Sequence, residues 1–242
     1  MTASATALEA YRRIDFGQQT AIFDPTQLGD KVVVIGAGGI GGTLADVLAS
    51  LGIHTIEYCD GDRVEGRNVA STTLFGPDDI GRFKVDVVAD RLRHLGVPEV
   101  IVHQEHFDPA VHRDQLSGVV ITALDSMAIR RSIWEGAIRD NSDVVLLLDG
   151  RTGGMLCQLD IVFPSDPNDG EWYEGQQLFD DAHAAQLECT ARNIAFAPVA
   201  LAAFVARTLA RYVRGESLER AIYMHVDGLD IDVIERPAPD NS

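Results

Sequence analysis

The chain of 242 residues is 46% hydrophobic and 24% charged, and a chain of this length can bury a sizeable core. Its 20 Lys and Arg residues against 37 Asp and Glu residues leave a net charge of −17, which argues against binding to nucleic acid or to an anionic membrane surface. The longest nearly apolar run, 194–206, is shorter than the roughly 20 residues that cross a bilayer, and no secretory signal is visible at the amino end. We therefore expect a cytoplasmic protein.

The first half of the chain alternates short aliphatic runs with segments of helical periodicity. This pattern predicts strands at 31–35, 54–59, 100–103, 119–123 and 144–148, and helices at 39–51, 83–95 and 127–138. Strand–helix alternation of this kind predicts a parallel sheet that is covered by helices on both faces. The expected fold class is therefore α/β, with a Rossmann-like, doubly wound, mostly parallel sheet.

The second half of the chain has a different pattern. A strand at 156–163 is followed by a long polar connection, an acidic loop over 164–190 with seven acidic residues and no Lys or Arg before position 189. A structureless loop of this length is uncommon in a compact domain and is usually functional or mobile. Pro198 is well placed for the first turn of a helix, which should run to about 213.

The segments 223–226 and 229–233 flank Asp227-Gly228, a dipeptide that is typical of a tight hairpin. We expect these two segments to be antiparallel strands at the carboxy-terminal edge of the same sheet. The whole pattern predicts one domain over 31–235, preceded by a helical arm over 1–30 and followed by a disordered tail over 236–242.

A glycine-rich loop follows the first strand and opens the first long helix. Its glycines, Gly36, Gly38, Gly39 and Gly41, allow a tight turn and the close approach of a phosphate to backbone N–H groups at the helix end. Asp60 ends the second strand, 19 residues after Gly41, where a carboxylate can bind ribose hydroxyls. The alternative is that the glycines only pack helix against strand. The complete strand–loop–helix–strand–acid context favours nucleotide binding, without saying which nucleotide.

The residues after Asp60 indicate which kind of nucleotide-binding protein the chain resembles. Their order is Asp60-Gly-Asp62-Arg-Val64, then Asn68, then Asp79-Ile-Gly81, then Lys84, and later Ala123-Leu-Asp125. Together with the glycine loop, this spacing resembles that of the ThiF/MoeB/HesA adenylating enzymes, which are relatives of the ubiquitin-activating enzymes. The resemblance runs from about Tyr11 to Gly215 and is most specific between Val34 and Leu95.

The resemblance implies that the glycine loop cradles ATP and that the enzyme adenylates the C-terminal carboxylate of a ubiquitin-like or sulfur-carrier protein with a glycine-ended tail. It implies that Asp60 binds the ribose, and that Asp62 and Asn68 belong to the nucleotide site. Lys84 would neutralise phosphate charge and Asp125 would hold Mg²⁺.

The resemblance also implies a homodimer, in which Arg13 of one subunit reaches the ATP of the other; Arg12 fits this role equally well. The chemistry explains these residue types, because attack of a carboxylate on the α-phosphate builds negative charge on the phosphoryl oxygens and the leaving pyrophosphate. Backbone N–H groups, Lys84, an arginine and a metal ion would stabilise that charge.

The sequence departs from the family at two neighbouring positions. Ser71 and Thr72 stand where relatives usually carry an arginine–glutamine pair, so one cation near the phosphates is missing. Arg67, Arg82 and Arg130 are the candidates to replace it. The paired cysteines that bind structural zinc in many relatives are absent too, and we expect no zinc.

Cys189 follows the acidic loop in the sequence Glu188-Cys189-Thr190, which resembles the position of the nucleophile in thioester-forming relatives. Cys189 either accepts the acyl group as a thioester, with a conjugating enzyme as a further partner, or is a small apolar residue at a loop end. The many acids before it disfavour a thiolate. Cys59 and Cys157 lie inside predicted strands and are expected in the core.

Residues 149–154 form a second polar, glycine-bearing segment at the end of a predicted strand. Arg151 in this segment either contacts the substrate or phosphate or caps a turn.

Two functions compete with adenylation. One is that of an NAD(P)-dependent oxidoreductase, which only the glycine loop and Asp60 support; the other is that of a non-catalytic subunit that pairs with an active homologue, suggested by Ser71 and Thr72.

Overall fold

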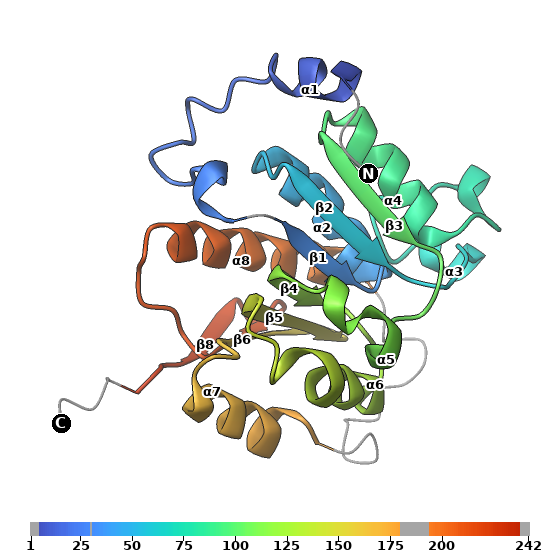
Figure 1. Cartoon of the computed structure of the whole chain (residues 1–242). Helices are drawn as coiled ribbons and strands as arrows, with labels where there is room; N and C mark the ends of the chain where they lie inside the picture. Colours follow the sequence, from blue (N-terminus) through green and yellow to red (C-terminus); the bar gives the residue numbers. More distant parts are fainter. Residues whose placement is uncertain (1–4, 30, 180–193, 238–242) are drawn as a thin grey trace.

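The computed structural model describes residues 5–29, 31–179 and 194–237. Within these residues the chain builds one eight-stranded sheet in the order β3-β2-β1-β4-β5-β6-β7-β8 (Figure 1). The strands are β1 Val32–Ile35, β2 Thr55–Cys59, β3 Glu99–His103, β4 Gly118–Thr122, β5 Val144–Gly153, β6 Leu156–Val162, β7 Ala221–His225 and β8 Asp230–Ile234. The α-helices are α1 Ala5–Tyr11, α2 Gly39–Ser50, α3 Gly66–Val69, α4 Lys84–His94, α5 Pro109–His112, α6 Met127–Ile133, α7 Pro167–Trp172 and α8 Phe196–Val213. Short 3₁₀ or π-helical turns are η1 Pro25–Gln27, η2 Pro77–Asp79, η3 Arg113–Gln115, η4 Trp134–Ile138 and η5 Tyr173–Gln177.

The first five strands are parallel, and this half of the sheet confirms the predicted fold class. β1 pairs with β2 on one side and with β4 on the other, so the strand order reverses between β1 and β4. In open α/β sheets ligands bind in the crevice at the carboxyl ends of the strands where this reversal occurs. The carboxyl ends of β1, β2 and β4 are therefore where a site is expected.

The last three strands are antiparallel and complete the sheet. β5 turns back into β6, and β6, β7 and β8 pair in succession, as expected for the carboxy-terminal edge. The hairpin between β7 and β8 is wider than predicted. His225 pairs with Asp230, so the loop has four residues, 226–229, with Leu229 at φ 58°.

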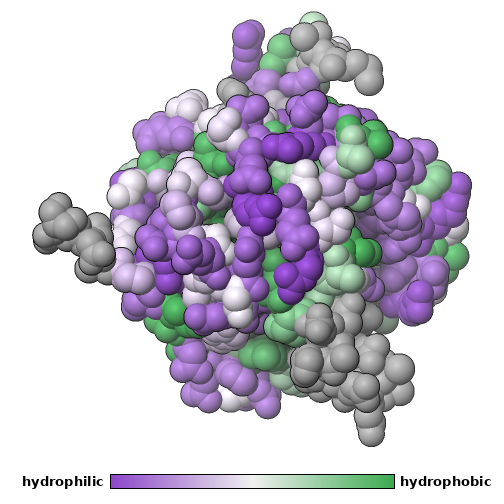
Figure 2. Space-filling model, turned by 60° about the horizontal axis from the view of Figure 1, so that its bottom comes forward, coloured by the Kyte–Doolittle hydropathy of each residue, from purple (hydrophilic) through white to green (hydrophobic). Residues whose placement is uncertain are grey.

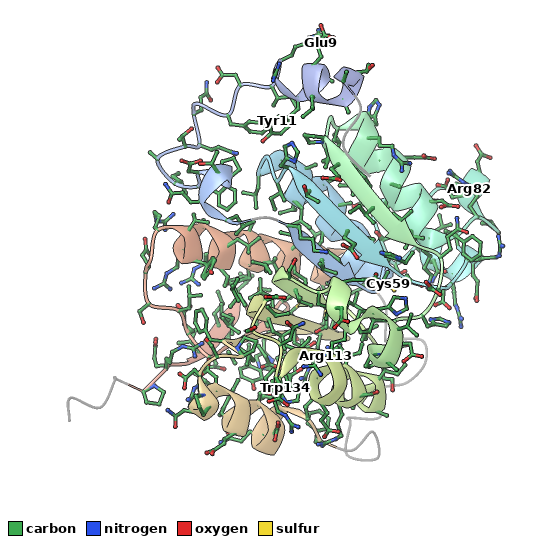
Figure 3. The ribbon with its side chains drawn as sticks, viewed as in Figure 1. Glu9, Tyr11, Cys59, Arg82, Arg113 and Trp134 are labelled. Atoms are coloured by element: carbon green, nitrogen blue, oxygen red, sulfur yellow. The ribbon has the colours of Figure 1, made fainter. Side chains whose placement is uncertain are left out.

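Two apolar layers lie on the two faces of the sheet because side chains alternate along each strand. On β1, Val32 and Val34 join a core with α2, α4 and α8, whereas Val33 and Ile35 join a second core with α6 and η5. Figure 1 shows α8 on one side of the sheet and α6 and α7 on the other. Trp134 fills the second core between α6 and the segment after α7, with its ring 5.1 Å from that of Tyr173 (Figure 3).

Helix α8 is 18 residues long with a mean hydropathy of 1.3, which is enough by length and composition to cross a membrane. It begins at Phe196, so Pro198 lies in its first turn, and it ends at Val213, both as predicted. Its buried side chains, among them Leu201, Val205 and Leu209, belong to the same core as the sheet and α2. This placement is that of a core helix in a folded domain.

The segment after β6 corrects the prediction of a structureless acidic loop. Residues 167–177 are helical, as α7 and η5. Asp166 caps this helix by accepting the Asn168 N–H, Pro167 occupies its first turn, and Trp172 and Tyr173 are buried. The number of acidic residues suggested a loop, but the segment is helical and buries Asp169 together with Trp172 and Tyr173. Residues 180–190 of the predicted loop lie outside the described residues.

The predicted tail also begins too early. Arg236 forms an ion pair with the buried carboxylate of Asp169 and donates a hydrogen bond to the Ile161 carbonyl at 3.0 Å. Asp169 additionally accepts the Arg220 guanidinium at 3.1 Å. A buried carboxylate needs such partners, so Arg236 is part of the fold.

Candidate nucleotide-binding site

The glycine turn between β1 and α2 has the geometry that the sequence predicts. Gly36 has φ +101°, and a Cβ there would lie 2.4 Å from the Ala123 carbonyl oxygen. A Cβ on Gly41 would lie 1.9 Å from the Gly36 carbonyl oxygen, whereas one on Gly38 would meet no atom of the described residues within 4 Å. Gly36 and Gly41 therefore hold the turn, and around Gly38 the described part of the chain leaves space.

The amino end of α2 opens onto that space. Its N-cap residue is Gly38, which supplies no side chain to the N–H groups of the first turn. Unpaired N–H groups at a helix start, together with the helix dipole, attract an anion such as phosphate. Gly39 lies deeper, with its Cβ direction towards the Ser71 carbonyl and Pro198.

Asp60 supports the turn from the end of β2. Its Oδ2 accepts the Ala37 N–H at 2.7 Å, and its Oδ1 accepts the Asp62 N–H at 2.7 Å. Each carboxylate oxygen keeps a second lone pair, so these bonds leave capacity for a ribose hydroxyl. Asp60 thus fixes the first residue after Gly36 as well as facing the crevice.

Asp62 and Lys84 form an ion pair beside this turn. The Lys84 Nζ lies 2.7 Å from Asp62 Oδ2, and the Lys84 side chain is only 10% exposed. This hydrogen bond lowers the pKa of Asp62. The two residues meet because the stretches around Val64 and Gly81 pair with each other, through bonds from Val64 N–H to the Arg82 carbonyl and from Gly81 N–H to the Val64 carbonyl.

The ligand atoms of Asp60, Asp62 and His106 lie within 4.8 Å of one another, a spacing that could hold a metal ion. The Asp60 oxygens already accept two N–H groups, and one Asp62 oxygen holds the Lys84 ammonium. A cation here would compete with Lys84 for the same carboxylate. These carboxylates are better explained as the residues that fix the Lys84 ammonium than as a metal site.

Asn68 lies in the short helix α3, where its Oδ1 accepts the Glu65 N–H at 2.8 Å. This capping bond orients the side chain and leaves its amide nitrogen without a hydrogen bond to any residue that the structure describes. An amide N–H₂ is a suitable donor to a phosphate oxygen.

Ser71 and Thr72 are buried against the start of α2. The Ser71 hydroxyl donates to the Asn68 carbonyl at 3.0 Å, and the hydroxyls of Thr72 and Thr43 lie 3.4 Å apart. These two positions pack the glycine helix and carry no charge.

The three arginines considered as replacements differ in their freedom. Arg130 is buried, and Arg82 is held by Asp79 and Asp90. Arg67 is 76% exposed and forms an ion pair with the half-exposed Glu65, at 2.8 Å. To reach a ligand, Arg130 would leave a buried carboxylate and Arg82 would leave two carboxylates, whereas Arg67 would leave one exposed carboxylate.

Asp125 lies in the loop that follows β4, and this loop adjoins the glycine turn. Thr122 pairs with Ile35, and the Leu124 side chain would lie 3.4 Å from a Cβ on Gly36. The Asp125 carboxylate is exposed and makes no hydrogen bond or ion pair with the described part of the chain. A carboxylate next to a phosphate-binding turn is a suitable ligand for Mg²⁺, which binds through one or two carboxylates and the phosphates of its substrate.

A buried charged network lies beneath the Asp125 loop, and the sequence analysis missed it. Asp149 and Asp160 are fully buried, and Arg130 and Arg151 neutralise them. Asp149 also accepts the Tyr173 hydroxyl at 2.9 Å. Burial raises the pKa of Tyr173 to about 12 and lowers that of Arg130 to about 10. The signal in the sequence was the charged residue Asp160 in the middle of an otherwise apolar strand.

Arg151 does not lie at the exit of a strand, because β5 continues through Gly153. Its guanidinium binds Asp149 at 2.6 Å and Asp160 at 3.0 Å and donates to the Gln177 carbonyl at 2.9 Å. It thus holds two buried carboxylates and caps the end of η5.

Cys189 lies outside the described residues. Cys59 and Cys157 are 3% and 1% exposed, as predicted for core residues. Burial raises the pKa of Cys59 to about 12 and that of Cys157 to about 11.

Arg13 lies at the far end of the same subunit. The arm that carries it is anchored where the Tyr11 hydroxyl donates to the Gly52 carbonyl at 2.6 Å and the Phe16 ring packs on Gly52. Gly52 follows the carboxyl end of α2, whose 12 residues span about 18 Å from the glycine turn. Figure 3 shows Tyr11 just beneath α1, at the end of the molecule where the amino-terminal arm lies. Arg13 is therefore remote from the glycine turn of its own chain.

Comparison with known proteins places this site in a family. The family model described as ThiF matches residues 26–241. Similar curated proteins include the adenylyltransferase and sulfurtransferase uba4 of Aspergillus niger, 32% identical over 62% of this chain and 33% of that protein. The NEDD8-activating enzyme E1 catalytic subunit of Caenorhabditis elegans is 29% identical over 55% of this chain and 34% of that protein. The chain thus spans about a third of the length of these two relatives.

Solved structures show the same fold at low sequence identity. E. coli MccB with ATP superimposes with a TM-score of 0.71 at 19% identity, over 89% of this chain and 67% of that one. PaaA superimposes with a TM-score of 0.70 at 19% identity, over 97% of this chain and 75% of that one. Because the ThiF model covers most of the chain, from the end of the arm past the last strand, the protein belongs to the ThiF family.

Proposed function

We propose that the protein is an ATP-dependent adenylyltransferase that activates the C-terminal carboxylate of a ubiquitin-like or sulfur-carrier protein. The observation that carries the proposal is the glycine turn at the shared edge of β1, β2 and β4, which has an open helix start, the buried Lys84 on one side and the loop with the exposed Asp125 carboxylate on the other. Family membership supports it, as do relatives named for adenylyltransferase and E1 activities.

The reaction is a displacement at phosphorus. A carboxylate oxygen of the partner attacks the α-phosphorus of ATP, the bond to the bridging oxygen breaks, and pyrophosphate leaves with an acyl adenylate as product. The N–H groups at the start of α2 and the Lys84 ammonium stabilise the charge on the phosphate oxygens. Lys84 is suited to this because its ammonium is fixed by Asp62 before the ligand arrives. Asp125 would hold Mg²⁺, which would neutralise phosphate charge.

Arg67 supplies the cation that Ser71 does not. It is one residue from Asn68 in α3, its guanidinium is exposed, and its present partner is an exposed carboxylate. Exchanging a surface ion pair for a phosphate costs little, because exposed pairs contribute roughly 0–1 kcal/mol.

The site is completed by a second copy of the chain. Arg13 is too far from its own glycine turn to serve it, so it contributes only across the interface of a homodimer. The partner protein's glycine-ended tail enters the same crevice from outside.

The acyl adenylate has two possible acceptors. In the first, the Cys189 thiolate attacks the acyl carbon, the carbon–oxygen bond to AMP breaks, AMP leaves, and the thioester passes to a conjugating enzyme. In the second, another nucleophile attacks the adenylate directly. An adduct on Cys189 that thiol reductants release distinguishes the two.

Pyrophosphate exchange into ATP tests the proposal, with small glycine-ended proteins from the same source as candidate partners. We expect exchange with the correct partner, and a loss of at least about a hundredfold in Lys84→Ala and Asp125→Ala, the size of effect seen when one charge-stabilising group is removed. Exchange that survives both substitutions would show that the site is elsewhere. Binding of NADH without binding of ATP would favour an oxidoreductase.

A further inference from the structure

The buried guanidinium of Arg130 lies directly beneath the loop that carries Asp125. Arg130 is in α6, one turn after that loop, and its residue is only 3% exposed. Burying a guanidinium is costly, and an apolar side chain in its place often gives a fold of equal or greater stability. A buried arginine therefore calls for an explanation beyond packing.

The Arg130 guanidinium contacts two backbone carbonyls and one buried carboxylate. Its Nη2 donates to the Leu124 carbonyl and, at 3.1 Å, to the Gly150 carbonyl. Its Nη1 forms an ion pair with Asp149 Oδ1. One planar group thus joins the end of β4, the middle of β5 and the start of α6.

The bond to Leu124 bears directly on Asp125. A peptide unit is planar, so fixing the Leu124 carbonyl fixes the N–H and the Cα of Asp125 in the same plane. On the other side of Asp125, the Ser126 hydroxyl accepts the Ile129 N–H at 3.3 Å and sets the start of α6. The backbone on both sides of Asp125 is thus held, while its exposed carboxylate makes no hydrogen bond or ion pair with the described residues and attracts Arg130 only through its charge.

Asp149, the ion-pair partner of Arg130, is itself held in place. Asp149 is fully buried and accepts hydrogen bonds from the Thr122 hydroxyl, the Tyr173 hydroxyl and Arg151. Thr122 is the last residue of β4, so the strand end and the loop after it share one network. The guanidinium cannot move without leaving a buried carboxylate short of a partner.

We propose that Arg130 is a positioning residue, which orients the Asp125 loop so that its carboxylate meets the metal ion bound with the nucleotide. This inference rests on the proposed function for the identity of that ion. Groups that orient a metal ligand typically raise metal affinity about 10–100-fold.

The test uses the full chain with Arg130→Met, Arg130→Lys and the control Arg131→Met. Arg131 is the next residue of α6, and its contacts are to Glu135 and the Leu178 carbonyl, away from Asp125. Amide hydrogen exchange of residues 124–127 is measured first, without nucleotide. We expect faster exchange by tenfold or more in Arg130→Met, an intermediate effect in Arg130→Lys, and no change in the control.

The second readout is the Mg²⁺ concentration at half-maximal ATP binding, measured by calorimetry. We expect an increase of about 10–100-fold in Arg130→Met, with a much smaller change in ATP affinity at saturating Mg²⁺. Should Arg130→Met fail to fold, Arg130→Lys, which keeps the charge but loses the fork, decides instead. Unchanged exchange and unchanged Mg²⁺ dependence in a folded variant would overturn the inference. If the wild type binds no ATP, the proposed function fails, and the exchange data still decide whether Arg130 holds the loop.

Discussion

Burial controls the reactivity of the two cysteines that the structure describes. The Cys59 thiol donates to the Glu105 carbonyl at 3.1 Å, at the end of β2 (Figure 3), and the Cys157 thiol donates to the Ala197 carbonyl at 3.2 Å. With pKa values of about 12 and about 11 against the usual 9.0, their thiolate fractions fall about 1000-fold and 100-fold.

Alkylation by iodoacetamide at pH 8, followed by peptide mapping, checks this expectation. Cys59 and Cys157 should stay unmodified until denaturant is added. Fast modification of Cys157 in the folded protein would contradict the reading of both thiols as core residues.

Glu219 is the residue for which a pH effect on stability is expected. Its carboxylate lies 2.9 Å from Arg207 and also contacts Arg211, and hydrogen bonding to Arg207 lowers its pKa to about 2 from 4.5. A lowered pKa in the folded state gives stability that is present above the unfolded value and is lost as pH falls from about 4.5 towards about 2.

Glu219→Gln should therefore lose on the order of 2 kcal/mol at neutral pH, less than the full shift implies because water screens Arg207. Urea unfolding at several pH values is the measurement. The difference between wild type and variant should shrink as pH approaches 2. An equal difference at every pH would show that the ion pair is not its source.

At the scale of elements, the glycine turn allows a direct test of what each glycine does. A Cβ on Gly41 would meet the Gly36 carbonyl oxygen at 1.9 Å, so Gly41→Ala must displace α2 or the turn. We expect a loss of about 1–3 kcal/mol in stability, as for other overpacked positions.

Gly38→Ala is the matched control, since its Cβ would meet no atom within 4 Å in the part of the chain that the structure describes. It should keep nearly wild-type stability in urea but bind ATP more weakly, because the added methyl group lies where the phosphates approach. A Gly41→Ala variant as stable as the wild type would contradict the close approach of Gly41 to the Gly36 carbonyl oxygen.

The parallel half of the sheet was predictable element by element, because β1, β2, β4 and β5 are short aliphatic runs separated by amphipathic helices. The segment 167–177 was not, since its acids suggested a loop while Trp172 and Tyr173 supplied the buried face. Its start signal, Asp166 followed by Pro167, was present but outweighed by the charge count.

The candidate site also has a part that the sequence could reveal and a part that it could not. Asp62 and Lys84 could be singled out because both residues belong to one spaced motif, but their ion pair with each other is seen only in the structure. The network of Arg130 and Asp149 could not, because an ion pair between a helix and a strand far apart in sequence leaves no periodic pattern.

For the whole molecule, the most informative feature is the distance between the arm and the crevice within one chain. Figure 1 shows α1 at the far end of the molecule from α6 and α7. If Arg13 acts across a homodimer, mixing Arg13→Ala with Asp125→Ala protein should restore about a quarter of the exchange activity, since one site in four keeps both residues by random pairing. Mixtures no more active than either variant alone would refute completion of the site in trans.

The surface of the molecule is consistent with a protein partner rather than a nucleic acid. Figure 2 shows a face on which hydrophilic residues predominate, and the chain as a whole carries a net charge of −17. A strongly acidic protein repels a polyanion and favours partners with basic surfaces.

Calorimetric titration of the purified protein with ATP and Mg²⁺, alongside NADH, shows whether the crevice at the glycine turn is an ATP site. We expect ATP to bind in the presence of Mg²⁺, Lys84→Ala to weaken this binding at least tenfold because one charged phosphate contact is lost, and NADH not to compete. Tighter binding of NADH than of ATP with Mg²⁺, or ATP binding that is indifferent to Lys84, would contradict this expectation.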